Sequence, residues 1–146
     1  MRHLSLRSCE LCTRHANDDF EEAGGMLETL SRTLGGMDTL TSLDLSNNSL
    51  GLDGIARVAS VANCTTLSHL NLAQNMLTPA AGKMVVAVLP RTPAPLHLQL
   101  QNNELRSEGM AELAKAFKLT GPLAGGKEKG GLALLHVGQN AIGVAG

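Results

Sequence analysis

One arrangement of apolar and polar positions occurs four times along the chain. Apolar residues stand three and five positions before an asparagine and again two positions after it, and three of the copies have a leucine eight positions before it. Alternating apolar and polar residues are typical of a strand with one buried face. Each copy therefore predicts a short strand that ends in a turn at the asparagine. The copies are "LTSLDLSNNSL" (40–50), "LSHLNLAQNML" (67–77), "PLHLQLQNNEL" (95–105) and "LALLHVGQNAI" (132–142).

A glycine and a helical pattern follow the first three asparagines. The glycines stand six or seven positions after their asparagines, at Gly54, Gly82 and Gly109. The apolar residues behind them are spaced i, i+3, i+4 and i+7, which is the spacing of one helix face. A further helix is expected near 20–34. Polar residues near the predicted helix starts are candidate caps: Asp53, Thr78 and Ser107.

The unit of strand, asparagine turn and helix resembles the leucine-rich repeat, LxxLxLxxNxL. Its length resembles the long form that is typical of ribonuclease inhibitor, NOD-like receptors and Ran GTPase-activating protein. The resemblance covers most of the chain from Leu40 onward. It implies an α/β fold, a leucine-rich repeat solenoid or horseshoe, with parallel strands on the concave face and helices on the convex face.

A fifth copy is predicted at the start of the chain, where Met1, Leu4, Leu6 and Leu11 keep the same offsets and Cys9 replaces the asparagine. The chain then forms a single leucine-rich repeat domain of about five units. Because no polar cap is visible at either end, we expect the chain to be part of a longer array. The predicted units are 1–39, 40–66, 67–94, 95–131 and 132–146, of which the last is incomplete.

The recurring asparagines are interpreted as structural and not catalytic. An inward bend after each strand leaves buried backbone groups that need hydrogen-bond partners. An asparagine amide supplies two donors and an acceptor, and it can bridge to the next unit. A thiol is a weaker donor that can take the same place, so Cys9 is expected to be buried. The predicted ladder consists of Cys9, Asn48, Asn75, Asn103 and Asn140.

The polar positions of the strands are expected to line the concave surface. His69 and His97 should be neighbours on adjacent strands, and solvated surface histidines, a metal contact and a pH-sensitive contact all fit such a pair. The surface lacks Trp and Tyr, which often anchor interfaces, so edges, loops or further repeats are expected to contribute to binding. The seventh strand positions, including Ser46 and Ala73, are assigned to it as well. The candidate binding residues are His3, Arg7, Asp44, His69, Asn71, His97, Gln99 and His136.

Two further motifs suggest ligands. His3, Cys9, Cys12 and His15 are a candidate set of zinc ligands, but the repeat directs Cys9 inward and His3 outward, so we expect no metal. "GPLAGGK" (121–127) satisfies GxxxxGK, but Glu128 follows where a P-loop has Ser or Thr, and the segment precedes a strand. We interpret it as part of a surface-loop insertion, "TGPLAGGKEKGG" (120–131), and predict no cofactor. Cys64 is interpreted as a packing residue.

Composition and charge narrow the classes of partner. The net charge is -1, with 12 basic and 13 acidic residues, and aromatic residues are limited to two phenylalanines. This balance favours neither nucleic acid nor an anionic membrane, and no apolar run approaches the roughly 20 residues that span a bilayer. Three cysteines and no secretory signal predict a reducing compartment, most simply the cytoplasm, with cilium or nucleus as alternatives. The first 16 residues are rich in arginine and therefore also resemble an organelle transit peptide.

These observations predict a non-enzymatic module or scaffold that binds protein partners. Two alternatives are open. One is a regulator of a small GTPase, by similarity to Ran GTPase-activating protein, although that family has an acidic tail that this sequence lacks. The other is a structural subunit of a larger assembly, such as a ciliary or receptor complex. The sequence identifies no particular partner.

Overall fold

A computed structural model describes residues 2–12, 20–89, 96–120 and 132–143 of the 146-residue chain. The GxxxxGK segment, His15 and all but the first residue of the predicted 120–131 insertion lie outside these ranges. Strands alternate with helices along the chain. In order they are β1 (His3–Ser5), α1 (Phe20–Gly35), β2 (Ser42–Asp44), α2 (Gly51–Arg57), the 3-10 helix η1 (Ala59–Asn63), β3 (His69–Asn71), the 3-10 helix η2 (Pro79–Ala81), α3 (Gly82–Val88), β4 (Leu96–Gln99), α4 (Arg106–Thr120) and β5 (Leu132–His136).

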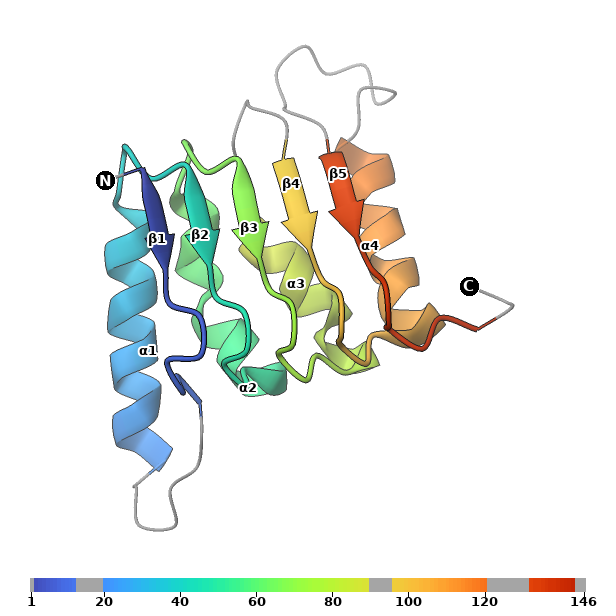
Figure 1. Ribbon diagram of the computed structural model, residues 1–146, viewed down its shortest axis with the longest axis horizontal. Coiled ribbons are helices and arrows are strands. Elements are labelled where there is room, and N and C mark those ends of the chain that lie inside the picture. The colour runs from blue at the N-terminus through green and yellow to red at the C-terminus, as the bar shows by residue number, and fades with distance from the viewer. Residues whose placement is uncertain (1, 13–19, 90–95, 121–131, 144–146) are drawn as a thin grey trace.

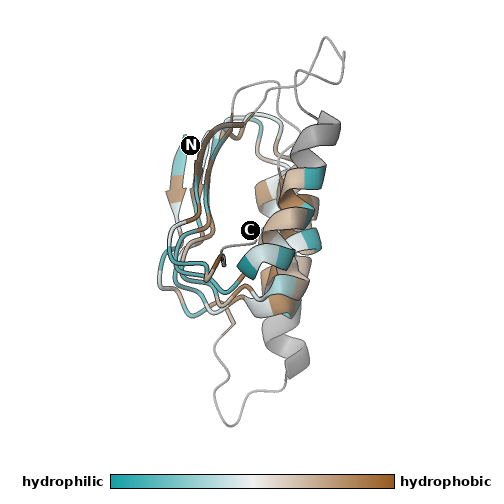
Figure 2. Ribbon diagram, turned by 90° about the vertical axis from the view of Figure 1, so that its right-hand side faces the viewer, coloured by the Kyte–Doolittle hydropathy of each residue, from teal (hydrophilic) through white to brown (hydrophobic). Residues whose placement is uncertain are grey.

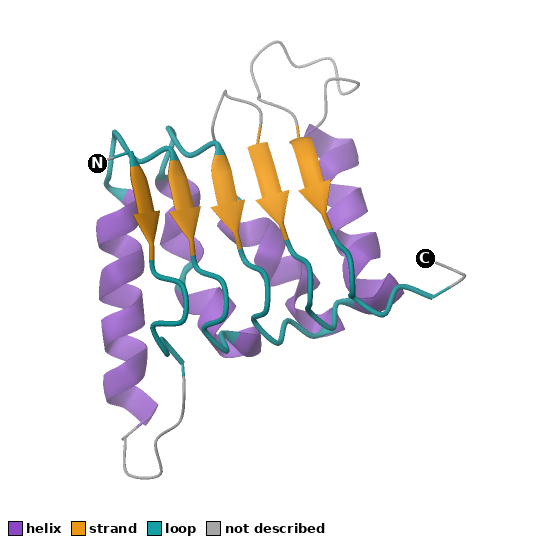
Figure 3. Ribbon diagram, viewed as in Figure 1, coloured by secondary structure: helices purple, strands orange, loops and turns teal. Residues whose placement is uncertain are grey.

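The five strands form one parallel sheet in the order of the sequence, β1-β2-β3-β4-β5. Each strand pairs with the next at the positions that the repeat alignment makes equivalent; Leu43 pairs with Leu70, and Leu70 pairs with Leu98. The helices all lie on one face of this sheet, and the other face is uncovered (Figure 1, Figure 2). The prediction of an α/β repeat fold with parallel strands and helices on one side is confirmed (Figure 3).

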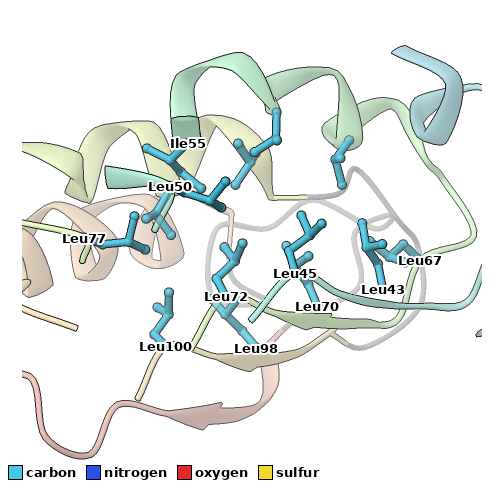
Figure 4. Close-up of a cluster of buried hydrophobic side chains, with 14 of the residues drawn as sticks. Leu43, Leu45, Leu50, Ile55, Leu67, Leu70, Leu72, Leu77, Leu98 and Leu100 are labelled. Carbon is cyan, nitrogen blue, oxygen red and sulfur yellow. The ribbon is translucent and has the colours of Figure 1, made fainter. Parts of the chain in front are cut away.

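Leucines fill the space between the sheet and the helices. Leu43, Leu70 and Leu98 point from the middle of their strands toward the helices, and each is at most 1 % exposed. Figure 4 shows them packed with the leucines from the strand ends and with Ile55 of α2. Burial of one such side chain stabilises a fold by about 1.5–3 kcal/mol. The apolar positions of the repeat therefore form one continuous core that fixes each strand's polar positions on the opposite face.

The helix starts agree with only one of the predicted caps. Thr78 occupies the capping position before Pro79 in η2, as predicted, but makes no side-chain capping bond. Asp53 lies inside the first turn of α2, and Ser107 lies inside α4. Backbone carbonyls in the asparagine turn of the next unit accept hydrogen bonds that a side-chain cap would otherwise accept. The carbonyl of Asn75 accepts the N–H of Gly51 at 2.9 Å, and the carbonyl of Asn140 accepts the N–H of Arg106 at the same distance. The first N–H of α2 and the first N–H of α4 are thus satisfied by the following unit of the stack.

Two of the recurring glycines, Gly82 and Gly109, lie where α3 and α4 approach closely. A β-carbon added at Gly82 would stand 2.7 Å from the carbonyl oxygen and 2.8 Å from the α-carbon of Gly109. These distances are too short for any side chain. The absence of a side chain at Gly82 therefore allows the close spacing between α3 and α4.

Candidate binding face and the turns that position it

The asparagine turns join each strand to its neighbour. The side chain of Asn75 is fully buried, and its Oδ1 accepts the backbone N–H groups of Asn48 at 3.0 Å and Leu50 at 3.4 Å. Its Nδ2 donates to the carbonyls of Leu45 at 2.9 Å and Ala73 at 3.2 Å. One amide thus satisfies backbone groups in two successive units. Because these buried polar groups are hydrogen-bonded, their burial does not destabilise the fold.

The same pattern is found one unit further along. Oδ1 of Asn103 accepts the N–H groups of Asn75 at 2.9 Å and Leu77 at 3.1 Å. Its Nδ2 donates to the carbonyls of Leu72 at 3.0 Å and Leu100 at 2.9 Å. The chain of bonds therefore passes from one asparagine to the next through the backbone N–H of each.

The two outer asparagines make equivalent bonds. Oδ1 of Asn48 accepts the N–H of Cys9 at 2.9 Å, and its Nδ2 donates to the carbonyl of Leu6 at 2.8 Å. Asn140 accepts the N–H of Leu105 at 3.3 Å and donates to the carbonyl of Leu100 at 2.7 Å. Every asparagine of the repeat thus has both an acceptor and a donor bond to the unit before it.

Cys9 occupies the asparagine position of the first unit but is exposed, so the expectation of a buried thiol is wrong. Its Sγ donates to the carbonyl of Arg7 at 3.6 Å, two residues earlier. Asn48 and Asn75 make the same bond to the carbonyls two residues before them. The difference in burial arises because β1 is an edge strand of the described sheet, and no described strand covers its outer side.

The backbone on both sides of the buried asparagine is left-handed in several turns. Asn48 lies between Asn47 (φ 57°) and Ser49 (φ 52°). Asn75 lies between Gln74 (φ 56°) and Met76 (φ 57°). Sequence reasoning did not identify this feature, although Asn47 and Asn102 were a signal, because Asn tolerates this conformation better than most residues. The two left-handed residues turn the chain inward and bring the asparagine side chain under the strand ends.

Two rows of side chains point away from the helices, and we call these rows together with Arg7 the open face. The first row is in register across the sheet: His3, Ser42, His69, His97 and Leu134. The second row, also in register, follows two residues later: Ser5, Asp44, Asn71, Gln99 and His136. All of these side chains are exposed or half-buried. Seven of the eight candidate binding residues therefore share one side of the sheet, and the eighth, Arg7, is exposed just after β1.

The seventh strand positions are not uniformly exposed. Ser46 and Ala73 are only 3 % and 4 % exposed, so their assignment to the surface is wrong. The cause is local, because Oδ1 of Asp44 accepts the N–H of Ser46 at 2.9 Å and Oδ1 of Asn71 accepts the N–H of Ala73 at 3.0 Å. Such a side-chain-to-backbone bond two residues on starts a turn, and the chain bends inward there.

Histidines are concentrated on the open face. His3, His69, His97 and His136 are four of the five histidines in the chain. The rings of His69 and His97 lie side by side on adjacent strands, with centroids 4.4 Å apart and planes tilted by 36°. Oγ of Ser68 lies 3.0 Å from Nδ1 of His69. This contact fixes one ring nitrogen of His69 and leaves its Nε2 for other partners.

The described members of the candidate zinc set, His3, Cys9 and Cys12, do not assemble into a metal site. Within the part of the chain that the structure describes, no three His, Cys, Asp or Glu side chains are placed to hold a metal ion. Cys12 packs against Gly54, and burial raises the pKa of its thiol, an effect that Arg57 opposes and Asp53 adds to. Cys64 is buried, and its Sγ donates to the carbonyl of Met37 at 3.3 Å. The packing role predicted for Cys64 agrees with this environment.

The segments 37–59 and 63–86 match a family model described as "Leucine Rich repeat". Together they make up about a third of the chain, and they contain β2 with α2 and β3 with most of α3. A search of curated proteins found no match. None of the described helices is both long and apolar enough to cross a membrane. The two matched segments are thus similar to leucine-rich repeats, and the parallel sheet with helices on one side agrees with that similarity.

Proposed function

We propose that the chain is a non-enzymatic module that binds a partner protein on its open face. Leucine-rich repeats generally mediate protein–protein interaction. The observation that carries the proposal is the contrast between the two sides of the sheet. Leucines of every strand are directed toward the helices, whereas two rows of side chains in register, all polar except Leu134, are covered by no described segment. A rigid array of hydrogen-bonding groups of this kind suits recognition of another protein surface.

The size of the open face indicates how a partner would engage it. Five strands at a spacing of about 4.8 Å make the face about 19 Å wide, and its two rows are about 7 Å apart. A standard interface covers about 800 Å² of each partner. The open face supplies only part of that area, so we expect the partner to extend onto the exposed turns beside the ladder asparagines or onto further repeats.

The repeat length supports a finer assignment, to the ribonuclease-inhibitor-like subfamily with a horseshoe-shaped solenoid. The units that start at Leu40 and Leu67 are 27 and 28 residues long, and in these two units a helical segment follows each strand. Helices are wider than strands, so stacking such units would curve the sheet and make the open face concave. Three free cysteines suit a reducing compartment such as the cytoplasm.

Site-specific photo-cross-linking tests the proposal. One variant carries a photoreactive benzophenone amino acid in place of Ser42 on the open face, and its matched control carries it in place of Lys83, which is exposed on α3. We expect the variant at Ser42 to cross-link a partner protein in cell extract and the variant at Lys83 not to cross-link the same protein. Cross-linking of the same partner from Lys83 alone would show that the helices bind it, which would contradict the proposal.

A further inference from the structure

The open face differs from the rest of the chain in its ionisable groups. The chain carries 12 lysines and arginines and 13 aspartates and glutamates. Of these, the open face holds only Arg7 and Asp44, whose formal charges cancel. The remaining titratable groups on it are the four histidines. An imidazole gains a positive charge between about pH 5 and pH 8, so the charge of this face is set almost entirely by its histidines.

The arrangement of the histidines concentrates this charge. His69 and His97 are held by adjacent strands with their rings 4.4 Å apart. When both are protonated they repel each other, and an anion that contacts both rings removes this repulsion. The groups that face the pair are Ser42 and Asp44 from β2 and Leu134 and His136 from β5. Asp44 is the only carboxylate among them, and its Oδ1 already accepts the N–H of Ser46.

We propose that the open face binds an acidic segment of the partner protein at His69 and His97 and that this binding is stronger in acid, where imidazole side chains carry a positive charge. The inference rests on the proposed function, because it specifies the chemistry of the partner at the same surface. Carboxylates form short, charge-assisted hydrogen bonds with imidazolium N–H groups. Glutamate has an ordinary pKa of about 4.3, so the partner keeps its negative charge while the histidines gain theirs.

The positions of the histidines also define the path of the segment. His3, His69, His97 and His136 belong to strands β1, β3, β4 and β5, so the positive groups run across the sheet and not along one strand. This path is about 19 Å long, and an extended peptide advances about 3.3 Å per residue. About six residues of an acidic segment would span it.

A peptide-binding assay tests the inference without the natural partner. The probe is a fluorescein-labelled peptide of about six glutamates, and fluorescence anisotropy measures its dissociation constant at about pH 5.5 and about pH 7.5. We expect the unmodified chain to bind at least about ten-fold more tightly at the lower pH. A matched peptide of lysines should bind at neither pH. Equal affinity for the glutamate peptide at both pH values would overturn the inference.

Variants separate the effect of the histidine pair on peptide affinity from the effect of the net charge of the whole chain, which also becomes more positive in acid. The double variant His69→Gln/His97→Gln should lose most of the increase in affinity. A control variant, Lys83→Gln/Lys115→Gln, removes two exposed charges from the helices and should keep the increase. The variant His69→Lys/His97→Lys carries permanent charge and should bind the peptide at about pH 7.5 nearly as tightly as in acid. Circular dichroism verifies that each variant is folded.

These results are distinguishable from those of the cross-linking experiment. If the variant at Ser42 captures a partner but the glutamate peptide binds equally at both pH values, the open face is still the interaction surface and only its acidic partner chemistry is wrong. If the variant at Ser42 captures nothing that the variant at Lys83 does not, the proposed function itself fails. Retention of the full pH response by His69→Gln/His97→Gln would likewise contradict the role of the pair.

Discussion

The side-chain oxygen of Asn75 accepts the backbone N–H of Asn48 at 3.0 Å, although the two residues are 27 positions apart in the sequence. Asn75 in turn donates its own backbone N–H to Oδ1 of Asn103 at 2.9 Å. Each bond joins the turn of one unit to the turn of the next. The register of the strands, and with it the alignment of side chains on the open face, therefore depends on buried amides at the strand ends.

Substitution of Asn75 by alanine should strongly destabilise the fold. It removes the acceptor of the Asn48 and Leu50 N–H groups and the donor to the carbonyls of Leu45 and Ala73. Buried backbone groups left without partners cost about 1–3 kcal/mol each. We expect the free energy of unfolding, measured by urea denaturation, to fall by about 3 kcal/mol or more.

The matched control for that variant is Asn63→Ala, because Asn63 is an exposed asparagine at the end of η1. Its substitution should change the free energy of unfolding by less than about 0.5 kcal/mol. Equal effects of the two substitutions would show that the Asn75 amide contributes no more than a surface side chain.

Gly82→Ala should also destabilise the chain, despite the higher helix propensity of alanine. The added methyl group would meet the carbonyl oxygen of Gly109 at 2.7 Å, so α3 and α4 would have to separate. Overpacking of this kind costs about 1–3 kcal/mol. Gly138→Ala is the control, because a β-carbon there meets nothing within 4 Å. Thermal unfolding should show a lower midpoint for the first variant and an unchanged one for the second.

The left-handed backbone at Met76 predicts an unusual order of stability among variants at this position, with glycine more stable than valine. Met76 has φ 57° and is 61 % exposed, so its side chain contributes little packing. A β-branched residue is the least tolerant of this conformation, whereas glycine adopts it freely. Met76→Val should lower the free energy of unfolding by about 1 kcal/mol, and Met76→Gly should leave it unchanged or raise it. A destabilised glycine variant together with a neutral valine variant would contradict the observed turn.

The three cysteines should differ in their reaction with iodoacetamide. Cys9 is exposed, Cys64 is buried, and Cys12 is half-buried with a raised pKa caused mainly by desolvation. A raised pKa keeps the Cys12 thiol protonated to higher pH, and only the thiolate reacts quickly. Peptide mapping at about pH 8 should find Cys9 modified first, then Cys12, and Cys64 only after unfolding. Faster modification of Cys12 than of Cys9 would contradict this order.

The sequence predicted the fold well because the spacing of the apolar residues also determines which residues pair across the parallel sheet. Residues at equal distances from Asn48, Asn75 and Asn103 pair across the sheet, so the alignment alone located His69 beside His97. It failed where a local turn overrides the alternation. Ser46 and Ala73 are buried because Asp44 and Asn71 bond to their backbone N–H groups, and no pattern of apolar residues reveals such a bond.

The predictions of a buried Cys9 thiol and of side-chain helix caps failed for a different reason. Burial of a side chain and satisfaction of a helix start both depend on neighbouring units. The sequence shows what occupies the asparagine position of the first unit, but exposure of the Cys9 thiol follows from the place of β1 at the edge of the described sheet. Similarly, the N–H of Gly51 is satisfied by the carbonyl of Asn75 and not by a nearby polar side chain. A motif within one unit carries no signal for a partner in the next.

Amide hydrogen exchange followed by NMR tests most directly whether the asparagines join the units of the repeat. The N–H groups of Asn48 and Asn75 are bonded in the structure to side-chain oxygens of the following unit, and both residues are buried. We predict that these two amides exchange as slowly as the N–H groups of the central strands, at the rate set by global unfolding. Exchange of both amides at the rate of an unstructured peptide would show that the asparagines are solvated and would contradict the ladder on which the open face depends.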